Sequence, residues 1–260
     1  MLQSDGRLAC DNLTVSVNGR TLVSGLSVEL AAGNFVCVLG TNGAGKTLTL
    51  HTLAGLRAPQ AGHVFINDSR LDQLPRKAIA RQLGLLLQLH DDAFPMTVMD
   101  TVLMGRYPHA ALWNWSDKQA HELARNALNL LDLQGIENRI VTSLSGGERE
   151  RVALATIMVQ NPAIMLLDEP TNHLDPHHQL IVLDVLQNLA REGRIVATTV
   201  HNPALAMRYA DFVLLLYGDG GWEYGPASEL LEPERLQRMY KTPFDYFHDS
   251  NGGKSVLLPV

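Results

Sequence analysis

Residues 40–47 read GTNGAGKT, and this stretch decides the fold of the chain. It fits the pattern G-x-x-x-x-G-K-[ST], follows the apolar run at 34–39, and is followed by a helical pattern. Glycines let such a loop curl until successive backbone N–H groups point at phosphate oxygens, and the helix behind adds the positive end of its dipole. An ordinary glycine-rich turn is the alternative, but the flanking strand and helix favour a phosphate-binding loop.

The positions of this loop have distinct expected roles towards a nucleotide. Lys46 is expected to reach the β- and γ-phosphates, and Thr47 is expected to bind Mg²⁺. The nucleotide-binding residues predicted for the segment are Gly40, Thr41, Asn42, Gly43, Ala44, Gly45, Lys46, Thr47 and Leu48. Such a loop predicts nucleotide binding, and the rest of the chain must indicate what the nucleotide drives.

The composition is that of a folded protein and excludes two classes of partner. Of the 260 residues, 46% are hydrophobic and 18% are charged, which argues against general disorder. The 21 basic and 27 acidic side chains leave a net charge of -6, so no basic surface for nucleic acid or anionic lipid is expected. Two widely separated cysteines favour a reducing compartment, and no apolar stretch approaches the roughly 18 residues that span a bilayer. We expect a cytoplasmic protein that does not cross a membrane by itself.

Short apolar runs alternate with longer amphipathic stretches along most of the chain, which predicts an α/β fold with a mostly parallel sheet. The runs expected to be buried strands are 35–39, 83–87, 164–167, 195–200 and 212–217. Helices are expected near 46–56, 116–133, 147–160 and 177–191. In residues 8–29, apolar and polar side chains alternate around Asn18-Gly19, which predicts an antiparallel hairpin beside the main sheet.

We expect a single domain over residues 1–260, since no linker divides the chain. Its α/β core, with the hairpin as a β subdomain, is expected from about 1–88 and 161–220. The segment from about 89–160 has helical patterning and no strong strand candidate, so it predicts a helical subdomain inserted into that core. Residues from about 221–260 carry no motif and form a C-terminal segment.

Residues 144–148 read LSGGE and precede a helical stretch. Ser145 and Glu148 have the spacing of a capping box, which is a purely structural interpretation. It leaves Gly146 and Gly147 unexplained, because two glycines in a first helical turn lower helix stability. Bare amides at a helix N-terminus also form an anion site, so the two interpretations are compatible.

Two acids end the apolar run at 164–169, IMLLDE. An acid after a strand is commonly a solvated loop residue, and for the pair alone this alternative stays open. After a phosphate loop, Asp168 is expected to hold Mg²⁺ through water and Glu169 to face the attacking water. Adjacent strand residues point to opposite sides, and this would separate the two tasks.

These motifs stand in the order and approximate spacing of ATP-binding-cassette ATPases, and nearly the whole chain resembles this family. The resemblance rests on GTNGAGKT, Gln88 after LGLLL, LSGGE, LLDEPTNHLD at 166–175, and His201 after VATTV. It implies a RecA-like phosphate-loop sheet and the hydrolysis of ATP with Mg²⁺. The implied catalytic residues are Glu169, His201 and Gln88, and the implied metal-binding residues are Thr47, Gln88 and Asp168. Asp175 matches the aspartate of the loop after the paired acids, and before Pro176 it is also a good helix N-cap.

The resemblance implies that two copies form one working unit. In the family, the turn matched by Ser145, Gly146 and Gly147 closes on the γ-phosphate held by the loop lysine of the other copy, here Lys46. This implies a head-to-tail homodimer with two ATP molecules at its interface.

Two departures from the family pattern concern the base and the α-phosphate. Val15 and Val17 stand where the family usually has an aromatic residue that stacks on adenine. Leu48 stands where a hydroxyl residue often follows the loop. Binding of adenine is therefore implied by the family and not by these residues.

MGRYPH at 104–109, together with LLDEPTNHLD, resembles the ATPase subunits of importers of iron–siderophore complexes, cobalamin and haem. This implies a separate membrane permease docking near residues 88–110, a substrate-binding protein in the full system, and no nucleic acid partner. Apolar side chains in that segment are Phe94, Met96, Val98, Met99 and Met104, of which about half are expected to face the core. The implied location is the cytoplasmic face of the inner membrane, peripheral through the permease.

Three alternatives stay open. A soluble cassette ATPase acting on DNA, ribosomes or iron–sulfur assembly is disfavoured, because the chain has neither a long coiled-coil insertion nor two cassettes with a basic linker. The ATPase subunit of an exporter is the second alternative. A nucleotide-binding module without hydrolysis is the third, and it would not need Glu169.

Overall fold

The computed structural model describes residues 6–88, 95–109, 118–248 and 255–260. Its largest sheet has the strand order β10-β9-β3-β8-β7-β6. The strands are β3 (Phe35–Leu39), β6 (Leu83–Leu86), β7 (Ile164–Leu167), β8 (Ile195–Thr199), β9 (Phe212–Leu216) and β10 (Trp222–Pro226). The first five are parallel and β10 is antiparallel to β9, which confirms the predicted α/β fold.

The predicted and observed strands of this sheet agree closely. β3 and β7 have the predicted bounds, and β6, β8 and β9 each end one residue before the predicted run. Their residues are almost all buried, as expected of parallel strands with both faces covered. β10 was not predicted, because its residues are half-buried and its sequence WEYGP has no apolar run.

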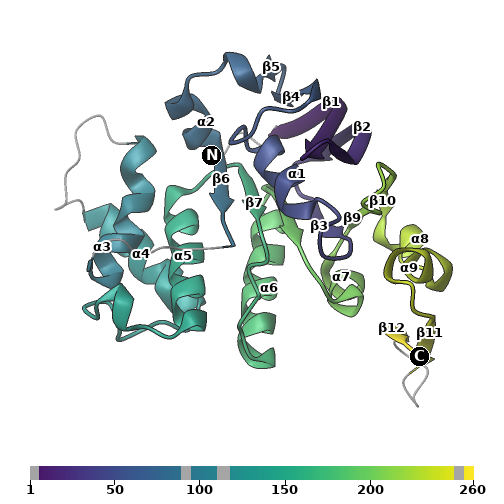
Figure 1. Ribbon diagram of the computed structural model, residues 1–260. Helices are drawn as coiled ribbons and strands as arrows, with labels where there is room; N and C mark the ends of the chain where they lie inside the picture. The colour runs from purple at the N-terminus through teal and green to yellow at the C-terminus, as the bar shows by residue number, and fades with distance from the viewer. Residues whose placement is uncertain (1–5, 89–94, 110–117, 249–254) are drawn as a thin grey trace.

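A second, antiparallel sheet lies at the upper right of Figure 1, with the strand order β2-β1-β4-β5. Its strands are β1 (Arg7–Val17), β2 (Arg20–Ala31), β4 (Ala61–Ile66) and β5 (Ser69–Arg70). The predicted hairpin is confirmed: β1 pairs with β2, and Asn18 (φ 49°) and Gly19 (φ 78°) take the left-handed conformations of a two-residue turn. β4 and β5 were not predicted. Leu13 and Leu26 share one buried cluster with Val36 of β3, so the two sheets have a common core.

Helices flank the main sheet on both sides (Figure 1). They are α1 (Lys46–Leu53), α2 (Arg76–Gln82), α3 (Val98–Leu103), α4 (Lys118–Leu130), α5 (Gly146–Gln160), α6 (Pro176–Arg191), α7 (Pro203–Tyr209), α8 (Ala227–Leu230) and α9 (Pro233–Tyr240). Short 3-10 turns lie at Leu71–Gln73, Met104–His109 and Val141–Ser143. Leu50 of α1 packs in the core shared with the antiparallel sheet, whereas Leu186 of α6 packs in a second cluster that covers the other face.

The four predicted helices correspond to α1, α4, α5 and α6. α3, α4 and α5 lie together beside β6 at the left of Figure 1, in the segment for which a helical subdomain is predicted. The C-terminal part forms β10, α8, α9 and a hairpin of β11 (Phe244–His248) and β12 (Ser255–Pro259). Across the described ranges, no helix has both the length and the hydropathy needed to span a membrane.

Gly105 lies where the turn Met104–His109 crosses α5. A Cβ at this position would lie 2.2 Å from the carbonyl oxygen of Thr156 and 3.0 Å from the backbone nitrogen of Gln160. Neither helix backbone atom can move freely, so we predict that Gly105→Ala lowers the free energy of unfolding by about 2 kcal/mol, as overpacked substitutions do. Urea denaturation of the full chain measures this change.

Gly6→Ala is the matched control. Its Cβ would lie 3.6 Å from the Ala163 side chain, which is an ordinary contact, so stability should change by less than about 0.5 kcal/mol. If both variants were as stable as the natural chain, the close approach at Gly105 would be contradicted.

Candidate functional site

The phosphate loop connects β3 to α1 at the carboxyl edge of the main sheet. Gly43 (φ 79°) and Gly45 (φ 101°) take left-handed conformations, and Gly45 is the N-cap of α1. Gly40 has no room for a side chain, because a Cβ there would lie 2.7 Å from the carbonyl oxygen of Leu216. The glycines therefore let the loop curl against β9 and leave the N–H groups at the start of α1 available to an anion.

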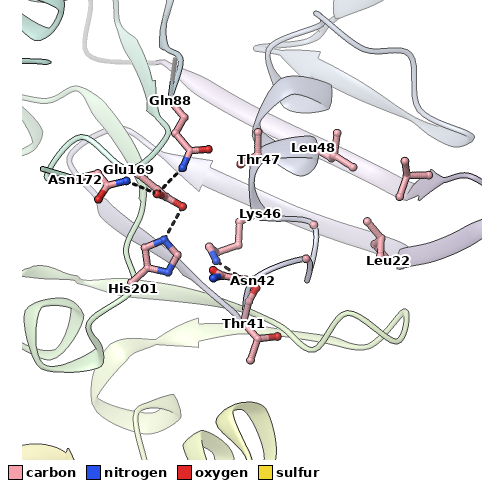
Figure 2. A pocket seen from close by; sticks show the side chains of 13 residues that line it. Leu22, Thr41, Asn42, Lys46, Thr47, Leu48, Gln88, Glu169, Asn172 and His201 are labelled. Atoms are coloured by element: carbon pink, nitrogen blue, oxygen red, sulfur yellow. Dashed lines mark hydrogen bonds and ion pairs between the residues drawn. The ribbon is translucent and has the colours of Figure 1, made fainter. Parts of the chain in front are cut away.

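Lys46 begins α1, and its side chain turns back towards the loop (Figure 2). Its ammonium donates hydrogen bonds to the carbonyl oxygens of Gly40, at 2.8 Å, and Thr41, at 3.3 Å. Burial lowers the pKa of Lys46, while the carboxylates of Glu169 and Asp168 act in the opposite direction. A buried ammonium bonded to neutral carbonyl groups can bind phosphate oxygens more strongly, because charge-assisted hydrogen bonds are stronger than neutral ones.

The loop forms one wall of a pocket of about 540 Å³. Its lining residues are Val17, Leu22, Thr41, Asn42, Gly43, Gly45, Lys46, Thr47, Leu48, Gln88, Glu169, Asn172 and His201. The pocket brings the predicted catalytic residues Gln88, Glu169 and His201 to the phosphate loop. Gly40 and Ala44 are buried beneath it.

Glu169 is the centre of the polar contacts in this pocket (Figure 2). Its Oε2 accepts hydrogen bonds from Gln88 Nε2 at 2.7 Å and Asn172 Nδ2 at 3.1 Å, and its Oε1 lies 2.5 Å from His201 Nε2. A carboxylate can only accept, so His201 donates from Nε2 in this contact. The expected strand alternation at the two acids is wrong, because β7 ends at Leu167 and Glu169 has a left-handed φ of 53°.

Asp168 is fully buried, and a threonine fixes it together with Glu169. The Thr199 hydroxyl donates to Asp168 Oδ1 at 2.8 Å, and Thr199 Oγ1 also accepts a hydrogen bond from the Glu169 backbone N–H at 2.7 Å. Neither Thr199 nor Asn172 was predicted as a site residue from the sequence. The one signal for Thr199 is the hydroxyl pair with Thr198, which ends an otherwise apolar strand.

An oxygen of Asp168 that is unpartnered within the described residues fits the chemistry of a magnesium site. Asp168 Oδ2 is buried and has no hydrogen-bond partner among the residues that the structure describes. A buried charged oxygen without a partner is destabilising unless a cation or a cation-bound water satisfies it. Thr47 and Gln88 add a hydroxyl and an amide oxygen on the pocket wall, and Mg²⁺ prefers oxygen ligands while it keeps several waters.

The LSGGE turn and Asp175 do not line this pocket. The Ser145 hydroxyl accepts the Glu148 backbone N–H at 3.3 Å, and the Glu148 carboxylate accepts the Ser145 N–H at 2.8 Å, which confirms the predicted capping box. Gly146 is exposed, and a Cβ there would meet no atom of the described residues within 4 Å. Asp175 caps α6 by accepting the His178 backbone N–H at 3.0 Å, as predicted. Within one chain, the LSGGE turn and Asp175 are thus separate from the phosphate loop.

The pocket wall next to the loop is aliphatic. Val17, Leu22 and Leu48 line it, and no Phe, Tyr or Trp is found among its lining residues in the described part of the chain. Val15 is 1% exposed and belongs to the core, so of the two valine positions only Val17 can touch a bound base.

Three features define a phosphate-loop nucleoside triphosphatase: a phosphate loop at the end of the parallel strand β3, a buried lysine, and two acids directly after β7, which is separated from β3 by one strand. The family model for ABC transporters matches residues 23–172, which is more than half of the chain. The chain belongs to the ABC transporter family and is one of its ATP-hydrolysing members.

Similar proteins extend this assignment over the full length. The ferric enterobactin transport ATP-binding protein FepC of Escherichia coli is 33% identical and the alignment covers 100% of this chain and 96% of FepC. The hemin import ATP-binding protein HmuV of Pseudomonas aeruginosa is 36% identical, with 90% of this chain and 92% of HmuV covered. A solved metal-chelate type ABC transporter in an inward-facing conformation is 28% identical with a TM-score of 0.84, covering 98% of both chains.

A tyrosine at position 17 would supply the ring that the aliphatic wall lacks. We predict that Val17→Tyr lowers the Kd for ATP by roughly 5- to 10-fold, because stacking on a base contributes about 1–3 kcal/mol and part of this is lost in ordering the new side chain. Isothermal titration of the full chain with ATP measures the change.

Ser16→Tyr is the control for this prediction. Successive strand residues point to opposite faces, so the same ring at position 16 should leave the Kd unchanged. An unchanged Kd in Val17→Tyr would mean that the base does not lie against this wall.

Proposed function

We propose that the chain is the ATP-hydrolysing subunit of an importer of a metal chelate, such as an iron–siderophore complex, cobalamin or haem, and acts through a separate membrane permease. The observation that carries the proposal is the full-length similarity to FepC and HmuV, whose names state transport of ferric enterobactin and import of hemin. The similar metal-chelate type transporter supports the same class. The proposal names no single substrate, because an ATPase subunit does not touch the cargo.

We assign the hydrolytic step to Glu169 as general base. Its carboxylate is oriented by Gln88, Asn172 and His201 in the pocket of the phosphate loop, so it can accept the proton of a water that attacks the γ-phosphate. His201 can then exchange its contact with Glu169 for one with the γ-phosphate. Catalysis of phosphoryl transfer is mostly positioning and charge stabilisation, which a set of fixed polar side chains provides.

The phosphate loop and three oxygen donors are assigned to the nucleotide and its metal. Lys46 binds the β- and γ-phosphates, and the loop from Gly40 to Leu48 wraps the phosphates with its N–H groups. Thr47, Gln88 and Asp168 would hold Mg²⁺, which would neutralise phosphate charge.

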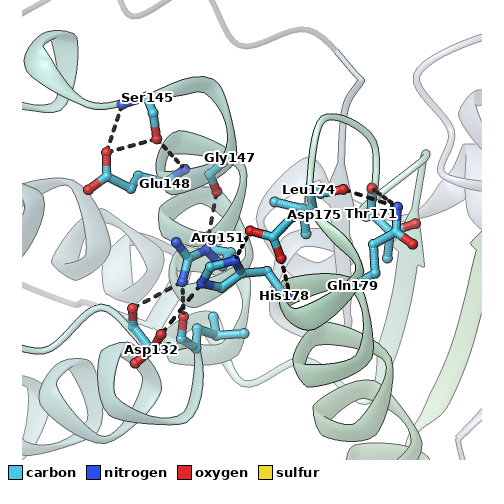
Figure 3. A network of polar contacts seen from close by, with 11 residues as sticks. Asp132, Ser145, Gly147, Glu148, Arg151, Thr171, Leu174, Asp175, His178 and Gln179 are labelled. Carbon is cyan, nitrogen blue, oxygen red and sulfur yellow. Dashed lines mark hydrogen bonds and ion pairs between the residues drawn. The ribbon is translucent and has the colours of Figure 1, made fainter.

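We propose that two copies assemble around two ATP molecules. The support is that the Ser145-Gly146-Gly147 turn is an exposed helix start with open space at Gly146, although it does not line the pocket of its own chain. A helix start of this kind binds anions, so it can meet the γ-phosphate held by Lys46 of a second copy. Figure 3 shows Asp175 near the first turn of α5, which carries Gly147. Closure with ATP and opening after hydrolysis would form the working stroke.

The permease is proposed to dock near residues 88–110. Of the five apolar side chains singled out there, Phe94 lies outside the described residues and Val98 is fully buried. Met104 is 43% exposed, and such flexible apolar side chains suit the binding of a helix. This contact would hold the subunit at the cytoplasmic face of the inner membrane, with a substrate-binding protein completing the system.

The alternatives are a soluble ATPase acting on DNA, ribosomes or iron–sulfur assembly, an exporter subunit, and a binding module without hydrolysis. FepC and HmuV favour transport over the first, and the word import in the name of HmuV favours uptake over the second. The contacts around Glu169 favour hydrolysis over the third.

Replacement of the proposed base tests the hydrolytic assignment. We predict that Glu169→Gln lowers ATP turnover by at least about 100-fold, because general bases contribute about 10²–10⁴-fold, while ATP binding is retained. With ATP, the variant should accumulate as dimers in size-exclusion chromatography. The control Glu122→Gln, which changes an exposed acid on α4, should behave as the natural chain. Unchanged turnover in Glu169→Gln would favour the binding module without hydrolysis.

Membrane fractionation tests the importer assignment. When co-expressed with its candidate permease, the chain should sediment with membranes, and Met104→Asp should reduce the bound fraction by roughly 10-fold, because a charge is placed at the proposed contact. Leu130→Asp, a change at a 56% exposed leucine on α4, is the control and should remain bound. Recovery of the natural chain only in the soluble or ribosomal fraction, with the permease present, would contradict the importer proposal.

A further inference from the structure

A polar bridge joins the helices that follow β6 to the loop after Glu169 (Figure 3). In this bridge, His178 on the first turn of α6 lies between two carboxylates. Its Nδ1 is 2.8 Å from Asp175 Oδ2, and its Nε2 is 3.5 Å from Asp132 Oδ2, in the turn after α4. Both ring nitrogens thus lie near a carboxylate oxygen, one at the start of α6 and one in the turn after α4. The bridge connects two segments that are far apart in the sequence.

The Asp132 side of the bridge is fixed to the LSGGE turn. Arg151 on α5 is 6% exposed and donates hydrogen bonds to the carbonyl oxygens of Leu131, at 2.8 Å, and Asp132, at 3.0 Å. Its Nε also donates to the carbonyl oxygen of Gly147 at 3.4 Å. The turn that carries Asp132 is thus held against the first turn of α5 through backbone atoms.

The Asp175 side of the bridge is fixed to α6 and touches α5 directly. Asp175 Oδ1 accepts the backbone N–H of His178 at 3.0 Å, and Oδ2 contacts the His178 ring. These hydrogen bonds hold the pKa of Asp175 below its ordinary value. A Cβ on Gly147 would lie 3.0 Å from Leu174 Cδ2 and 3.4 Å from the carbonyl oxygen of His173, so the two segments are in close contact.

The contacts continue from this loop to the proposed base. Gln179 Nε2 donates to the carbonyl oxygens of Leu174, at 3.1 Å, and Thr171, at 3.4 Å. Asn172 lies between Thr171 and Leu174 in the sequence, and its Nδ2 donates to Glu169 Oε2 at 3.1 Å. A displacement of the loop at Leu174 would therefore move the amide that orients Glu169.

We propose that His178 is a positioning residue for ATP hydrolysis: by joining Asp132 to Asp175, it makes the LSGGE turn and the loop after Glu169 of the same chain move together. The inference rests on the proposed assembly of two copies, in which the LSGGE turn binds the ATP of the other copy. Closure of that turn on one ATP would then set the loop beside Glu169 at the chain's own ATP, so the two sites would be coupled.

Two single variants and their double variant test this in the purified full chain. His178→Asn keeps an amide near the position of Nδ1 for Asp175 but does not reach Asp132. Asp132→Gly removes the carboxylate and suits the left-handed backbone at this position (φ 54°), while the Arg151 hydrogen bonds to backbone carbonyl groups remain. We expect each variant to lower kcat about 10-fold at unchanged KM for ATP, within the range of typical coupling energies. The double variant should fall no further than the singles, because all three lose the same interaction.

His177→Asn is the matched control, because this exposed neighbour meets the His178 ring edge-on at 5.2 Å and lies outside the bridge. It should keep the kcat of the natural chain. Thermal unfolding of every variant accompanies the kinetics, since a merely structural role would lower the Tm and the yield of folded protein and leave kcat per folded chain unchanged. An unchanged kcat per folded chain, or losses of kcat that multiply in the double variant, would overturn the inference.

Failure of the two-copy proposal is seen separately, as the lack of ATP-dependent dimers in Glu169→Gln, whatever the result at His178.

Discussion

The structure around the phosphate loop is governed by one electrostatic constraint, which is the burial of several charged groups at one edge of the sheet. Lys46, Asp168 and Glu169 are each less than 9% exposed, and Glu150 on α5 is 7% exposed beside the two acids. Burial, with the carboxylates of Asp168 and Glu169, raises the pKa of Glu150 to about 7. A site with more buried acids than bases binds a cation readily, and isolated charges of this kind are destabilising unless hydrogen bonds fix them.

The parallel sheet meets this constraint by bringing strand ends together. β3 leads into the phosphate loop, β7 leads into the two acids, and β8 ends at Thr199, whose single hydroxyl holds both Asp168 and Glu169. β9 contributes the carbonyl group of Leu216 against which the loop is packed at Gly40. Because parallel strands all end at the same edge, residues that are far apart in the sequence form one pocket, as is usual in open α/β sheets.

The features that could be predicted from the sequence are those with a recognisable local sequence pattern. The buried strands are continuous apolar runs, and the phosphate loop and the LSGGE turn are short motifs with a local mechanism. β4, β5 and β10 escaped prediction because short or half-buried strands have no such run. Thr199 and Asn172 escaped because their roles depend on atoms that meet only after folding. Strand alternation failed at Glu169, since the chain leaves the β conformation after Leu167 and the direction of the side chain is set by a left-handed φ.

Two features of the isolated chain lower its own stability, and they lie in different places. Gly146 stands in the first turn of α5, where glycine is less favourable than alanine, and no atom of the described residues lies within 4 Å of a Cβ at this position. Asp168 Oδ2 is a buried carboxylate oxygen without a partner in the described ranges. A residue that lowers stability and has no compensating contact within its own chain commonly belongs to a functional site. Asp168 directly precedes Glu169, which lines the pocket, whereas no residue of the LSGGE turn lines it. In the proposed pair of copies, the open backbone at Gly146 would face an anion held by the other copy, and this role would offset the lower helix stability.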